Sequence, residues 1–95
     1  MVEGPGAPDS DGVDFRTFIL SLGTSAMLHL GEIPDPDGGK AVVNLELARQ
    51  TINLLDLIRS KTAGNLTDDE ANTLGGLLYD LRMRFVARSR GASAD

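Results

Sequence analysis

Phe15-Arg-Thr-Phe-Ile-Leu-Ser-Leu-Gly-Thr-Ser-Ala-Met-Leu-His-Leu30 is the stretch that decides the fold of this 95-residue chain. After Arg16 it carries no formal charge until Glu32, and small residues are interleaved with large apolar ones. A helix on the surface of a small protein normally keeps one charged face toward water. This stretch has no such face, so we expect a helix that other helices surround on most of its sides.

The ends of this first helix are marked by capping residues. Asp14 can accept hydrogen bonds from the free N–H groups of the first turn, and Gly31 can supply the left-handed residue that often ends a helix. Gly23 in mid-helix costs roughly 1 kcal/mol relative to alanine, which indicates a partner helix packed close to it. Leu20 and Met27 lie about 100° from the main apolar stripe. That stripe contains Phe15, Phe18, Ile19, Leu22, Ala26 and Leu30.

Two further helices are predicted after a loop rich in Pro, Asp and Gly over residues 33–39. The second runs over residues 45–62 and is capped by Asn44. The third begins with the capping box Thr67-Asp-Asp-Glu70 and runs to about Ser89. The apolar arc of the second helix contains Leu45, Leu47, Ala48, Thr51, Ile52, Leu54, Leu55 and Ile58. The third has a core strip of Ala71, Leu74, Leu78, Leu81 and Phe85, and a second strip of Tyr79, Met83 and Val86 beside Gly75 and Gly76.

The predicted fold class is all-α, an antiparallel three-helix bundle forming one domain over residues 14–90 and completed by homodimerisation. Residues 1–13, rich in Gly, Pro and Asp, are predicted to be a disordered acidic tail, and residues 91–95 a frayed C-terminal tail. The chain has no cysteine, which excludes disulfides and thiolate zinc sites. Its single histidine removes most of the remaining arrangements of metal ligands. We predict no metal and no cofactor. Oligomerisation is then the usual remaining way to stabilise so small a core.

Charge and hydropathy exclude several classes of protein. The net charge of −5 argues against general affinity for nucleic acid or for an anionic membrane surface. The longest apolar stretch is shorter than the roughly 18 residues that span a bilayer, and no secretory leader is recognisable. We therefore expect a cytoplasmic protein without a membrane anchor.

Five segments of the chain form recognisable sequence motifs. They are Phe18-Ile-Leu-Ser-Leu-Gly-Thr-Ser-Ala26, Leu28-His-Leu-Gly-Glu-Ile-Pro-Asp-Pro36, Val43-Asn-Leu-Glu-Leu-Ala-Arg-Gln-Thr-Ile52, Gly64-Asn-Leu-Thr67 and Leu78-Tyr-Asp-Leu-Arg-Met-Arg-Phe85. Together these segments resemble a small bacterial family known as domain of unknown function 1844. The resemblance extends over roughly residues 14–88 and, because the family has no assigned role, implies no activity, cofactor or catalytic residue.

Two groups of polar residues could form sites, and each has a simpler structural interpretation. His29 and Glu32 could act as an acid–base pair, but a histidine at a helix end more often binds a backbone carbonyl or fills the core. Asp35-Pro-Asp-Gly-Gly39 resembles the start of a calcium loop, yet it lacks the third ligand and the closing glutamate. We therefore predict no catalytic residue and no metal site.

The end of the third helix is basic and could bind phosphate groups. Arg84 and Arg88 share a face there, although Asp80 is placed to pair with Arg84. Arg82 lies between the two apolar strips, so we predict that it is partly buried and clamped by a carboxylate. Its predicted partner in this structural clamp is Glu32, with Asp56 as the second choice.

We expect the chain to be a protein-interaction module, a homodimer with an unidentified protein partner. The alternatives are an RNA- or ribosome-associated adaptor that uses Arg84 and Arg88, and a small-molecule enzyme around His29 and Glu32. Binding of nucleic acid and of membrane is not favoured. The predicted self-association interface contains Leu20, Gly23, Ala26, Met27, Gly75, Gly76, Tyr79, Met83 and Val86.

Overall fold

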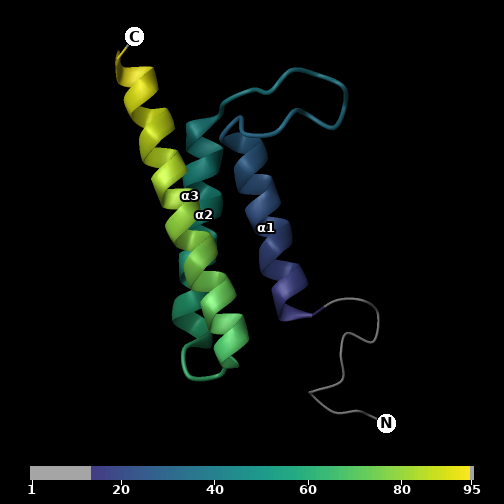
Figure 1. Cartoon of the computed structure of the whole chain (residues 1–95), viewed down its shortest axis with the longest axis vertical. Helices are drawn as coiled ribbons and strands as arrows, with labels where there is room; N and C mark the ends of the chain where they lie inside the picture. The colour runs from purple at the N-terminus through teal and green to yellow at the C-terminus, as the bar shows by residue number, and fades with distance from the viewer. Residues whose placement is uncertain (1–13, 95) are drawn as a thin grey trace.

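A computed structural model describes residues 14–94, without the side chains of residues 92–94, and the predicted disordered tail over residues 1–13 lies outside this part. The described chain forms three helices, α1 (Phe15–His29), α2 (Leu45–Thr62) and α3 (Asp68–Ala94). Consecutive helices run in opposite directions, so α1 and α3 point the same way (Figure 1). Each helix packs against the other two. The prediction of an all-α fold with three packed helices is confirmed.

All three helices begin at the capping residues that the sequence predicts. Asp14 and Asn44 each accept a hydrogen bond from the N–H three residues further on, at 2.8 and 3.0 Å. The backbone hydrogen bond holds the pKa of the Asp14 carboxyl below its ordinary value. At α3 the capping box is complete, because Thr67 Oγ1 accepts from the N–H of Glu70 and Glu70 Oε1 accepts from the N–H of Thr67.

The end of α1 is a Schellman motif built around Gly31. This glycine has a φ of 77°, which favours a residue without a side chain. Its N–H donates to the carbonyl of Leu28 at 3.0 Å, and the N–H of Glu32 donates to the carbonyl of Met27 at 2.9 Å. The motif turns the chain sharply, and so it places Glu32 just beyond the helix, beside α3.

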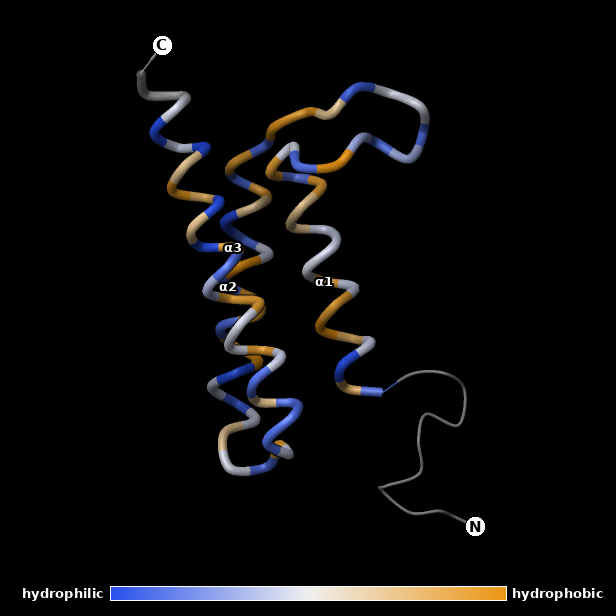
Figure 2. Tube along the Cα trace, viewed as in Figure 1, coloured by the Kyte–Doolittle hydropathy of each residue, from blue (hydrophilic) through white to orange (hydrophobic). Residues whose placement is uncertain are grey.

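The core lies where the three helices meet. Apolar residues recur along each helix, whereas most of the wide loop between α1 and α2 is hydrophilic (Figure 2). The large side chains that are fully buried come from all three helices and from the cap of α1, so none of the helices is peripheral. They are Ile19, Leu30, Leu55, Leu74, Leu78 and Leu81.

The structure differs from the predicted core at the flanks of the apolar arcs. Phe18, Leu47 and Leu54 belong to the predicted apolar arcs, and all three are exposed. A three-helix bundle gives each helix only two neighbours, so residues at the edge of a broad arc are beyond reach of either one.

The C-terminal end also differs from the prediction. The sequence predicted that the third helix ends at about Ser89, whereas α3 runs to Ala94. Helical hydrogen bonds join residues four apart, so the helix extends through Gly91 without needing a tertiary contact there.

Within residues 14–94, no helix combines the length and hydropathy that crossing a bilayer requires.

Candidate interaction surface

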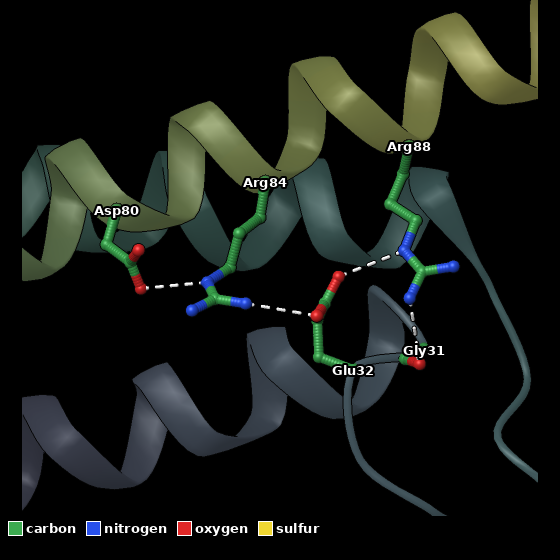
Figure 3. Close-up of polar contacts among 5 residues, drawn as sticks. All are labelled: Gly31, Glu32, Asp80, Arg84 and Arg88. Carbon is green, nitrogen blue, oxygen red and sulfur yellow. Dashed lines mark hydrogen bonds and ion pairs between the residues drawn. The ribbon is translucent and has the colours of Figure 1, made fainter.

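A cluster of charged side chains joins the end of α1 to α3 (Figure 3). Glu32 Oε1 accepts a hydrogen bond from Arg84 Nη1 at 3.0 Å, and Glu32 Oε2 accepts one from Arg88 Nε at 3.0 Å. Arg88 Nη2 also donates to the carbonyl of Gly31 at 3.2 Å, and Arg84 Nε donates to Asp80 Oδ2 at 3.0 Å. Because the Glu32 side chain is only 20% exposed, this cluster is a partly buried clamp between α1 and α3.

The predicted clamp therefore had the wrong arginine for Glu32. Arg82 pairs with the second-choice partner instead: its Nη2 lies 3.2 Å from Asp56 Oδ2, and both side chains are about half exposed. On α3, Arg84 and Arg88 are one turn apart and face α1, whereas Arg82 points toward α2. The carboxylate of Glu32 thus meets the arginines on its own side of α3.

The ion pairs that Arg84 and Arg88 form with Glu32 bear on the alternative function of an RNA- or ribosome-associated adaptor. The hydrogen bond to Asp80, more than the nearby Glu32, raises the pKa of Arg84 above its ordinary value. The guanidinium groups of both arginines already donate hydrogen bonds within the chain, so neither is free of intramolecular contacts to bind a phosphate.

At the two other candidate polar sites the structure shows local hydrogen bonds. His29 is partly buried, and its backbone carbonyl accepts a hydrogen bond from the N–H of Asn44 at 2.7 Å, which ties α1 to the start of α2. In the loop, Asp35 Oδ1 accepts from the N–H of Asp37 at 2.9 Å, which is turn chemistry. Across residues 14–94 no three His, Cys, Asp or Glu side chains come together as metal ligands would.

A row of large apolar side chains along α3 is left uncovered. Tyr79, Met83 and Val86 are 69%, 55% and 45% exposed, and with Gly75 and Gly76 we call them the outer face of α3. A groove of about 660 Å³ lies along this face beside α2. The groove is lined by Arg59, Gly75, Leu78, Tyr79, Arg82, Met83, Val86, Ala87 and Arg90. Apolar side chains thus share this surface with three arginines.

Three further residues of the predicted interface lie on the other side of α3. Leu20 and Met27 line a second groove of about 470 Å³ between α1 and α3, together with Gly23, Thr24, Ile33, Leu77 and Asp80. Ala26 is fully buried in the core and has no surface for a partner. The predicted interface therefore divides between two grooves on either side of α3, and Ala26 and Gly76 line neither of them.

The mid-helix glycines of α1 and α3 differ in what surrounds them. A Cβ added at Gly23 would lie 2.8 Å from Leu77 Cδ1, so the close neighbour that the sequence predicts for Gly23 is α3 of the same chain. A Cβ added at Gly75 or Gly76 would meet nothing within 4 Å. These two glycines each cost about 1 kcal/mol relative to alanine, and no contact in the described part of the chain offsets that cost.

Sequence reasoning found the apolar strip of α3 and the basic end of that helix, but it missed the arginine of α2 that borders the strip. Arg59 lines the groove from α2, and no role was predicted for it from the sequence. A signal was available, because Arg59 follows Asp56 by one turn and Asp56 was already placed near Arg82. Leu77, which covers Gly23, carried no recognisable signal.

The chain belongs to the family described as domain of unknown function DUF1844, which matches residues 12–87. This confirms the resemblance seen in the sequence. No curated protein and no solved structure matches the chain. The match contains Glu32, Arg84 and the outer face of α3, while Arg88 and Arg90 lie just beyond it. Because the family description assigns no activity, the surfaces of the molecule have to indicate the function.

Proposed function

We propose that this chain is a small protein-interaction module that forms a homodimer through the outer face of α3. The observation that carries the proposal is the exposure of Tyr79, Met83 and Val86 in a row beside two uncovered glycines. Folded monomers rarely present contiguous apolar patches larger than a few hundred Å², and such patches usually mark an interaction site. The glycines add room for a second helix to approach.

A second copy is the simplest occupant for this surface. In a two-fold dimer the same patch is used twice, so both copies lose their exposed apolar strip in one contact. The chain has no cysteine for a disulfide, and a core of this size supplies little stability alone. Association would supply some of what the small core lacks.

No specific observation favours the two alternative functions. An RNA adaptor would rely on Arg84 and Arg88, whose donors bind Glu32, Asp80 and a backbone carbonyl. An enzyme would need Glu32 to act with His29, yet both oxygens of Glu32 already accept hydrogen bonds from arginines.

Light scattering at micromolar concentration tests the proposal, with an expected mass of twice that of one chain. Met83→Lys should shift the population to monomer, because a positive charge would be buried in the interface beside the arginines that line the groove. Leu57→Lys is the matched control, since Leu57 is similarly exposed at 52% but lies on α2 away from both grooves. The wild-type chain behaving as a folded monomer at that concentration would refute the proposal.

Gly75→Leu provides a second test that does not introduce charge. The added side chain would fill the open space above Gly75 and overpack the interface, so we expect the dissociation constant to rise by about tenfold or more. Leucine also has a better helix propensity than glycine, so circular dichroism of the variant should show undiminished helix. Association unchanged by this substitution would place the interface elsewhere.

A further inference from the structure

The outer face of α3 extends beyond its apolar strip in both directions. The exposed Asp68 and Asn72 continue it toward the start of the helix, and the exposed Arg90 continues it toward the end. The positions 68, 72, 75, 79, 83, 86 and 90 follow steps of four, three, four, four, three and four residues. This spacing keeps all seven on one side of an α-helix, and it is symmetric about Tyr79.

From this symmetry we infer how the homodimer proposed above, on which the inference rests, is arranged. The two copies of α3 pack antiparallel, and the two-fold axis passes beside Tyr79. Each residue of the face then lies opposite the residue at the same distance on the other side of position 79. Asp68 meets Arg90 of the second copy, and Gly75 meets Met83.

Charge supports the antiparallel direction. Within residues 14–94, Asp68 and Arg90 take part in none of the ion pairs, whereas the adjacent Asp69 is held by Arg16 at 3.0 Å. The two residues are separated by about 33 Å along the helix, too far to meet within one chain. Antiparallel packing brings opposite charges together at both ends of the contact. Parallel packing would place Asp68 against Asp68 and Arg90 against Arg90.

Side-chain size supports the same direction. The space above Gly75 is open, and Met83 is a long, flexible side chain that is 55% exposed. In the antiparallel pair the methionine of each copy enters the space above the glycine of the other, which lets the helix axes approach within the usual 8–10 Å. In a parallel pair the two methionines would collide while the two glycines left a gap.

Cysteine cross-linking tests this arrangement, because the chain has no cysteine of its own. In the antiparallel dimer Tyr79→Cys lies beside the axis and should form a disulfide with its own copy under mild oxidation. Asn72→Cys and Val86→Cys should each fail to cross-link alone, but a mixture of the two variants should give the mixed disulfide. Leu57→Cys is the control and should stay uncross-linked.

Light scattering of each oxidised and reduced sample separates this inference from the proposed function. Wild-type monomer would overturn both. A dimer in which Asn72→Cys or Val86→Cys cross-links with itself would overturn the antiparallel arrangement and leave the dimer standing. If Tyr79→Cys weakens association, the mixture of Asn72→Cys with Val86→Cys still distinguishes antiparallel from parallel packing of the two copies of α3, because these two side chains lie away from the two-fold axis.

A charge exchange gives an independent readout. Asp68→Arg and Arg90→Asp should each raise the dissociation constant by about fivefold at low salt, since each creates two like-charged contacts per dimer. The chain that carries both substitutions should recover wild-type affinity, because the opposite charges again meet. Failure of the double variant to recover, with the single variants weakened, would show that these residues do not face each other.

Discussion

Leu81→Ala should lower the free energy of unfolding by about 3 kcal/mol, because a fully buried leucine loses its apolar contacts and leaves a cavity. Leu81 is 0% exposed and lies in the core cluster with Leu74 and Leu78 on the same helix. For a domain of this size that loss corresponds to a fall in Tm of about 15 °C. Thermal unfolding followed by circular dichroism measures it, at one fixed protein concentration for all variants.

Leu57→Ala is the control for the core substitution. It removes the same atoms from a side chain that is 52% exposed, so the expected change is within about 0.5 kcal/mol. Comparable losses from the two variants would contradict the arrangement of the three helices around Leu81.

Glu32→Ala should lower the free energy of unfolding by about 2 kcal/mol, through loss of the carboxylate that binds two arginines. Arg84 and Arg88 would then lie close together with no negative charge between them, and α1 would lose its ionic contact with α3. The effect is smaller than for a fully buried ion pair because the arginine side chains keep access to water. Urea unfolding monitored by circular dichroism gives the difference in free energy.

Asp56→Ala is the matched control for the clamp. It also removes a carboxylate that contacts α3, but its pair with Arg82 is about half exposed, so the expected loss is well under 1 kcal/mol. The sequence predicted that Arg82 is the arginine of the clamp, whereas the larger loss is now expected at the carboxylate that binds Arg84 and Arg88. If Asp56→Ala and Glu32→Ala lowered the free energy of unfolding equally, side-chain exposure would not determine how strongly each ion pair stabilises the fold.

The candidate surface was partly visible in the sequence. The strip of Tyr79, Met83 and Val86 followed from helical spacing, because the core strip of α3 was complete without it. Leu20 and Met27 were also found, but the sequence joined them to the same interface. It could not show that α3 separates the two sets, because that depends on where α1 lies against α3.

Local chemistry explains which features the sequence determined by itself. The caps at Asp14, Asn44 and Thr67 and the turn at Gly31 depend on hydrogen bonds between residues no more than five apart. Such bonds form in the same way whatever the helices later pack against. The first residue of each helix could therefore be predicted from the sequence. The presence of three consecutive helices, which is typical of a bundle, followed from these starting points.

Only the tertiary structure decided which groups meet across helices. A helical wheel gives the direction of a side chain around its own axis, but not the rotation of the neighbouring helix. Glu32 was therefore assigned to Arg82 although it binds Arg84 and Arg88. For the same reason the sequence could not distinguish Gly23, which Leu77 covers, from Gly75, which nothing in residues 14–94 covers.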